Sequence, residues 1–180
     1  MPDRIALLRA VNVGGTGKLA MADLTAMFVK LGFPDAKTLL QSGNVVFTGD
    51  GRKAEALEKF LEAETEKRLK LAPDYFVRTA KEWEAIIVAN PFVREAEADP
   101  GRLVLAALKD PPAPEAAKAL QTALKGRETV RAGTRHLYIY YPDGQGTSKL
   151  TMTVIERHLS TRGTARNWNT ALKLKALVQT

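Results

Sequence analysis

The chain has 180 residues, 45% of them apolar and 26% charged, which is the composition of an ordinary globular protein. It has no cysteine, which excludes disulfides, thiolate nucleophiles and cysteine-bound zinc, and its two histidines are too few for a usual metal triad. No apolar run approaches the roughly 20 residues that cross a bilayer, and the first residues do not resemble a secretory signal. We therefore expect a cytoplasmic protein with no membrane segment, no metal and no cofactor.

The net charge of +7 lies entirely in the last third of the chain. Residues 125–180 contain ten Lys and Arg against three acidic residues, whereas residues 1–124 contain 17 of each. A one-sided field of this kind favours an anionic partner, either a small molecule or a nucleic acid. A solvated basic surface without a partner is the alternative.

The first half alternates strands and helices. The apolar run 5–13, which ends at Gly14-Gly15, predicts a buried strand, and the helical spacing of apolar residues over 21–31 predicts a helix. The further elements expected are short strands at 36–41 and 44–48, a long helix at 52–71 and a strand at 73–78. This β-α-β-β-α-β order is the split βαβ or ferredoxin-like plan, in which two helices cover one face of a four-stranded antiparallel sheet.

The second half repeats much of this order after a helix at 80–89. The elements expected there are a strand at 102–108, a helix at 115–124, hairpin strands at 127–132 and 135–141, and helices at 148–159 and 164–178. We therefore predict an α+β fold of two ferredoxin-like modules with antiparallel sheets, packed together, and place the domains at 1–79 and 80–180. One fused sheet is the alternative.

The segment Arg9–Lys18 is the first candidate site. Its residues of interest are Arg9, Asn12, Gly14, Gly15 and Lys18. Glycines after a strand let backbone amides turn toward an anion, and the two cations could supply charge. The spacing matches neither the phosphate loop nor the dinucleotide fingerprint. A tight glycine turn that leads into a helix remains the alternative.

The segment Gln41-Ser42-Gly43-Asn44 is the second candidate. Ser42 could act as a nucleophile, but nothing in the sequence orients His136 or His158 toward it. The alternative is a turn in which the Ser42 and Asn44 side chains satisfy local backbone groups.

The third candidate is Thr164–Thr170, where polar residues crowd the start of the last expected helix. Free amides at a helix start favour an anion, and Arg166, beside Asn167, could grip a phosphate or carboxylate with two parallel bonds. Trp168 could stack on a base or lie in the core. A capped helix with a packed tryptophan is the alternative.

Recognition of RNA by such a basic protein would need exposed aromatic residues on central strands. The strands Ile5–Leu8 and Asn44–Phe47 contain one aromatic residue between them, which argues against base stacking on the first sheet.

The sequence resembles a bacterial family known as a domain of unknown function, number sixteen ninety-seven. The resemblance rests on Ala6–Arg9, Asn12–Gly15, Met21, Leu24, Gln41–Phe47, Asn90–Phe92, Ser148–Leu150 and Arg166–Thr170. The chain departs from the family at Ala10, where glycine is usual, and at Leu39, where an aromatic residue is usual. The resemblance implies a two-part α+β fold with ferredoxin-like topology, and it implies no activity or catalytic residue.

These observations lead to three hypotheses of function. The first is a binding module for a phosphate-bearing ligand, nucleotide or nucleic acid, whose site lies in a cleft between the modules. The residues expected to converge there are Arg9, Asn12, Gly14, Gly15, Lys18, Ser42, Asn44, Arg166 and Asn167. The second is an enzyme that acts on a phosphorylated small molecule, with Ser42 as nucleophile or Arg166 as stabiliser of charge. The third is a protein-interaction or self-association domain.

Overall fold

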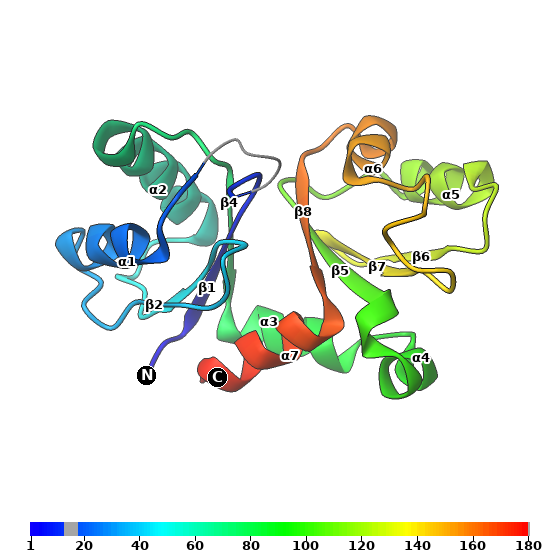
Figure 1. Cartoon of the computed structure of the whole chain (residues 1–180), viewed down its shortest axis with the longest axis horizontal. Helices are drawn as coiled ribbons and strands as arrows, with labels where there is room; N and C mark the ends of the chain where they lie inside the picture. The colour runs from blue at the N-terminus through cyan, green and yellow to red at the C-terminus, as the bar shows by residue number, and fades with distance from the viewer. Residues whose placement is uncertain (13–17, 180) are drawn as a thin grey trace. The chain divides into compact units, whose positions relative to one another are not determined.

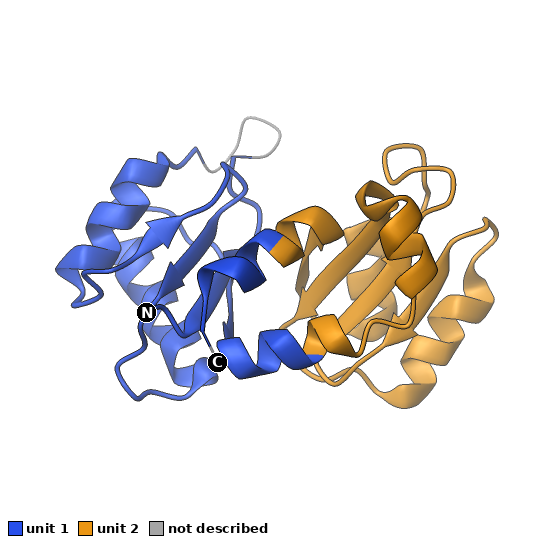
Figure 2. Cartoon of the chain, turned by 90° about the horizontal axis from the view of Figure 1, so that it is seen from below, with its two compact units in different colours: residues 1–85, 173–180 blue, residues 86–172 orange. Residues whose placement is uncertain are grey.

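The computed structural model describes residues 1–12 and 18–179. The chain divides into two compact units, one of Met1–Ala85 with Lys173–Thr180 and one of Ile86–Leu172 (Figure 2). Each unit contains one four-stranded sheet in which all neighbouring strands are antiparallel. The α+β class with two antiparallel sheets is therefore confirmed.

The first unit follows the split βαβ plan. Its elements are β1 (Arg4–Leu8), α1 (Met21–Lys30), β2 (Lys37–Thr38), β3 (Asn44–Phe47), α2 (Ala54–Leu69) and β4 (Tyr75–Thr79), in the sheet order β2-β3-β1-β4 (Figure 1). The two helices share a core with one face of the sheet, where Ala6 and Leu8 of β1 pack with Phe28 of α1 and Leu57 of α2. The alternate residues of β1 are buried too, which explains why this strand is a continuous apolar run.

Carboxylates of two helices cover the outer edge of β4. Alternate backbone N–H groups of this edge strand each donate to a glutamate. Tyr75 N–H donates to Glu62 at 3.0 Å, Val77 N–H to Glu58 at 2.9 Å and Thr79 N–H to Glu82 at 2.7 Å. Glu58 and Glu62 can each accept from one of two alternate strand residues because their spacings match. Four residues of helix rise about 6 Å, and two residues of strand rise about 6.6 Å. The otherwise unpaired edge is thereby satisfied.

The second unit has the same element order. It contains α4 (Val93–Ala98), a 3-10 turn (Pro100–Arg102), β5 (Leu103–Leu108), α5 (Pro114–Ala123), β6 (Thr129–Ala132), β7 (His136–Tyr140), α6 (Met152–Leu159) and β8 (Gly163–Asn167), in the sheet order β6-β7-β5-β8. Val104 and Ala106 of β5 share a core with Leu120 of α5 and Ile155 of α6.

The prediction of a helix at 164–178 is wrong for its first residues. Residues Gly163–Asn167 form β8, and helix α7 begins only at Trp168 and ends at Leu177. Ala165 and Arg166 suit a helix by propensity, but β5 has a free edge on that side, and five residue pairs between β5 and β8 satisfy it. The added strand completes the split βαβ order that the sequence left without its last strand.

Smaller differences also separate expectation from structure. The strand expected at 5–13 ends at Leu8, and the helix expected from Ser148 begins at Met152. Helix α4 was not expected, because its six residues contain no buried side chain and hence no apolar face to detect.

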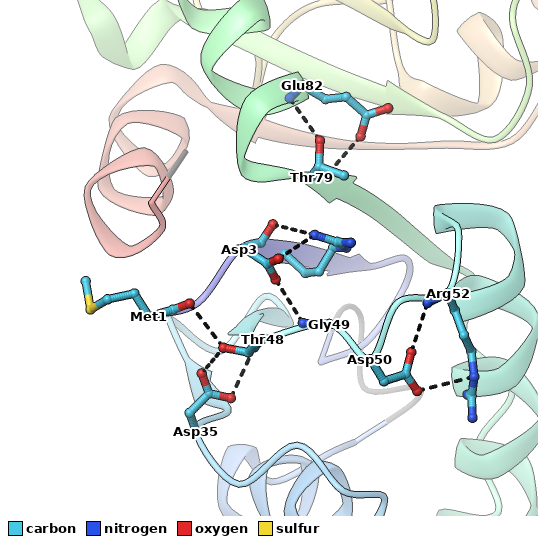
Figure 3. Close-up of polar contacts among 10 residues, drawn as sticks. Met1, Asp3, Asp35, Thr48, Gly49, Asp50, Arg52, Thr79 and Glu82 are labelled. Carbon is cyan, nitrogen blue, oxygen red and sulfur yellow. Dashed lines mark hydrogen bonds and ion pairs between the residues drawn. The ribbon is translucent and has the colours of Figure 1, made fainter.

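In each unit, one helix continues directly from the last strand. Helix α3 (Ala80–Val88) follows β4, and α7 follows β8; each changes unit partway along its length (Figure 2). At the start of α3, Glu82 N–H donates to Thr79 Oγ1 at 3.0 Å while Thr79 N–H donates to Glu82, which is a capping box (Figure 3). At the start of α7, Thr170 N–H donates to Asn167 Oδ1 at 3.0 Å. A polar cap thus marks each change from strand to helix.

Polar contacts also hold the segment that follows β3. Asp3 accepts from Gly49 N–H at 2.8 Å, and Asp35 accepts from the Thr48 hydroxyl at 2.6 Å (Figure 3). The first contact ties the N-terminal residues to the loop that leads into α2, and the second ties that loop to the residues before β2.

Candidate functional site

Several residues with left-handed backbone gather where β1 ends. Ala10 and Asn12 have φ angles of 62° and 55°, and Leu40 and Gly43, in the turn before β3, have φ of 61° and 80°. Gly43 O accepts from Leu8 N–H at 2.9 Å, so the two segments are adjacent. Left-handed backbone costs an L residue about 1–2 kcal/mol, and such strain is often found at functional sites. Glycine at position 10 would relieve this cost.

The Asn12 side chain joins three parts of the chain. Its Oδ1 accepts from Leu19 N–H at 2.8 Å, and its Nδ2 donates to Leu19 O and to Gln41 O, each at 2.8 Å. The first two bonds bring the residues on either side of segment 13–18 together, and the third links them to the turn before β3. The first and second candidate segments therefore meet at one end of the first sheet.

Gly43 is required by close packing as well as by its backbone angle. A Cβ atom at this position would lie 2.7 Å from Val11 Cγ2 and 2.9 Å from Leu8 Cβ. Next to it, the fully buried Asn44 donates from Nδ2 to Leu39 O at 2.7 Å and to Ser42 Oγ at 3.0 Å. The Asn44 amide cannot accept a proton, so this contact does not activate Ser42 as a nucleophile.

The cations expected at this end of the sheet lie at the surface. Arg9 is partly exposed and pairs with Asp74 at 3.5 Å, beside a shallow hollow of about 250 Å³ that Arg9 and Asp74 both line. Lys18 is exposed. Gly14 and Gly15 lie outside the described residues.

The third candidate segment belongs to the second unit, where its polar groups have structural contacts. Arg166 lies on β8 and not at a helix start; its side chain is 8% exposed, and its Nη1 donates to Thr164 Oγ1 at 2.8 Å and to Ala165 O at 2.9 Å. Burial lowers the pKa of the Arg166 guanidinium to about 10, which leaves it charged at neutral pH. Asn167 caps α7, and Trp168 is buried.

Arg166 has a counterpart in the first unit that the sequence did not reveal. Arg78 occupies the equivalent place on β4, opposite Ile5 of β1 as Arg166 is opposite Leu105 of β5. Each guanidinium donates to the carbonyl of the preceding residue, and Arg78 also lies 3.6 Å from Glu58. The shared position indicates that a buried arginine at this point of the plan has a structural role.

Several residues on the outer faces of the two sheets are too buried for a nucleic acid to stack on them. On the faces away from α1, α2, α5 and α6, Phe76 and Val46 are at most 1% exposed and Tyr138 is 3% exposed. The Tyr138 hydroxyl donates to Ile86 O at 2.6 Å. Base stacking on these strands, which the sequence argued against for the first sheet, has no exposed platform among these residues.

Within residues 1–12 and 18–179, no three His, Asp or Glu side chains lie close enough together to hold a metal ion. In the same part of the chain, no helix has both the length and the apolar character needed to cross a membrane.

The architecture defines the protein as one with two split βαβ units in a single chain. The chain belongs to the protein family of unknown function DUF1697, whose sequence pattern matches residues 1–138. The family suspected from the sequence motifs is thereby confirmed. No curated protein matches the chain. Among solved structures, the conserved bacterial protein SP0830 from Streptococcus pneumoniae is similar over 99% of this chain and 100% of its own, with a TM-score of 0.73 and 22% identity. At this identity the likeness supports the fold alone.

Proposed function

We propose that the protein is a binding module for a phosphate-bearing ligand, with the site at the end of β1 in the first unit. The observation that carries the proposal is the set of three hydrogen bonds from Asn12, which hold both sides of segment 13–18 against the Gln41 turn. Asn12 and Leu19 are thereby fixed beside the Gln41 turn before a ligand binds, which lowers the entropic cost of binding at this place.

The charges support an anionic ligand. Lys18 directly precedes Leu19, the residue that Asn12 bonds to, and it is exposed. Its ammonium group is therefore available to solvent and ligand. The charge of Arg9 is partly offset by Asp74, whose carboxylate lies 3.5 Å away in a long and weak ion pair. The Arg9 guanidinium could turn from this pair to a ligand that carries a stronger anion. Ser42 would line the neighbouring wall, and the buried Asn44 would hold it in place through its bond to the Ser42 hydroxyl. Arg166 and Asn167 are not needed for this proposal, because their contacts described above are structural. A cytoplasmic location is part of the proposal.

The test is a thermal-shift panel at low salt with phosphate, nucleotides, sugar phosphates and short RNA. A ligand at about 100 times its dissociation constant should stabilise the fold by roughly 2.7 kcal/mol, which corresponds to about 5–10 °C in Tm. The Lys18→Gln variant should reduce the shift, while Lys59→Gln, an exposed lysine on α2, should not. A flat panel with the unsubstituted protein, or equal losses in both variants, would contradict the proposal.

A further inference from the structure

The second unit contains a hollow that is separate from the site at the end of β1. It has a volume of about 420 Å³ and lies between the end of α5, residues 125–128 and residues 143–150. This volume is within the range of small-molecule sites in proteins. Leu124 and Leu150 give it an apolar wall, while Glu128, Ser148 and two lysines give it polar groups.

The polar wall is held in place by hydrogen bonds. The Ser148 hydroxyl donates to Glu128 Oε1 at 2.5 Å and accepts from Leu150 N–H at 3.0 Å. Leu150 O accepts in turn from the buried Tyr141 hydroxyl at 2.9 Å. Gly126 lies directly against the Glu128 carboxylate, in space that a Cβ atom would fill. Groups fixed in this way need little further ordering when a ligand binds.

The charges in the hollow are not balanced. Of its two carboxylates, Asp143 is already paired with Arg127, whose Nε donates to Oδ2 at 3.0 Å, and this bond lowers the pKa of Asp143. Lys125 and Lys149 also line the hollow and are exposed, and neither forms an ion pair within the described part of the chain. Two free ammonium groups beside one carboxylate favour a ligand that carries a doubly charged anion and also a hydrogen-bond donor.

We propose that this hollow, lined by Lys125, Glu128, Ser148 and Lys149, binds a small phosphorylated molecule that bears a hydroxyl group. The lysines take the phosphate, and Glu128 accepts from the hydroxyl. The site is independent of the one proposed in the first unit. The volume of about 420 Å³ suits a small molecule, whereas the backbone of a nucleic acid would follow a longer surface.

The experiment is titration of the full chain with glycerol 3-phosphate at low salt, followed by amide chemical shifts in nuclear magnetic resonance. Shifts confined to residues 123–128 and 143–150, with glycerol itself giving none, are the expected result. Loss of one charged hydrogen bond weakens binding about tenfold, so Lys125→Gln and Lys149→Gln should each raise Kd by about that factor. Lys118→Gln, an exposed lysine on α5 that does not line the hollow, should leave Kd unchanged.

Two further variants distinguish binding in this hollow from binding elsewhere on the chain. Glu128→Gln should weaken glycerol 3-phosphate more than inorganic phosphate, because only the former brings a hydroxyl group, and Lys18→Gln should change neither affinity. The inference is overturned if no shifts appear in these segments, if glycerol acts equally, or if Lys118→Gln matches the lining variants. It is also overturned if short RNA binds more tightly, with shifts that spread over the basic surface.

Discussion

Gly43 permits a test of the packing where β1 meets the turn before β3. We predict that Gly43→Ala destabilises the protein by clearly more than Gly51→Ala. Both glycines have left-handed backbone, with φ of 80° and 91°, and both lie in the first unit. They differ in their surroundings, because a Cβ atom at position 43 would meet Val11 and Leu8 below 3.0 Å, whereas at position 51 nothing lies within 4 Å.

The size of the difference follows from separate contributions. A left-handed alanine costs about 1–2 kcal/mol, and the reduced freedom of the unfolded chain returns about 0.4–1 kcal/mol. Gly51→Ala should therefore cost between about 0 and 1.6 kcal/mol. Gly43→Ala carries the same cost and adds overpacking against Val11 and Leu8, which is typically about 1–3 kcal/mol.

The assay is urea unfolding of both variants and the unsubstituted protein by far-ultraviolet circular dichroism, with the free energy of unfolding taken from midpoints at a common slope. The backbone cost is nearly equal in the two variants, so their difference isolates the clash. If Gly43→Ala were no less stable than Gly51→Ala, the close approach of residues 8, 11 and 43 would be refuted.

Three further predictions concern backbone, pH and the chain end. Ala10→Gly should stabilise the fold by about 0.5–1 kcal/mol, since it removes the strain at φ 62° but frees the unfolded chain; Ala63→Gly, at an exposed position within α2, should instead destabilise by about 1 kcal/mol in the same urea assay. Burial raises the pKa of the Tyr138 hydroxyl to about 12, compared with about 10 in the unfolded chain. The neutral hydroxyl therefore contributes its full share of the folding stability below about pH 10, and this share is lost as the pH rises from about 10 to 12. Tyr138→Phe should flatten the fall of Tm across that range, and an unchanged fall would contradict this. Leu174→Ala should cost about 2–5 kcal/mol because this α7 side chain is fully buried, whereas loss of the exposed Leu172 side chain should cost little.

Local patterns in the sequence predicted most of the elements. Helix α1 was expected at 21–31 and lies at 21–30, because its apolar residues recur at helical spacing and Gly32 follows it. On α2, Arg68 Nε lies 2.6 Å from Glu64 Oε2, at the i,i+4 spacing that brings side chains together on a helix surface. The first and second candidate segments meet at Asn12, whose Nδ2 donates to Gln41 O.

The roles of single polar residues could not be predicted in the same way. Asn12 was expected to face a ligand, and its described contacts hold turns together. The contacts of Asn44 match the alternative given for that segment, a turn whose side chains satisfy local groups. A sequence gives the donors and acceptors of a side chain, but not which backbone groups are left unpaired near it. The hollow near Ser148 was missed for a related reason, since its lining residues, within 123–128 and 143–154, lie apart in the chain and carry no common motif.

The sequence by itself determined the alternation of strands and helices, because apolar periodicity and glycine or proline breaks are local properties. Only the tertiary structure decided that residues 163–167 form β8, since the free edge of β5 outweighs the helical propensity of Ala165 and Arg166. It also decided that the end of α7 belongs to the first unit, where Gln179 N–H donates to Pro2 O at 2.9 Å. Such pairings join residues far apart in the chain, and their free energy depends on partners that no local window contains.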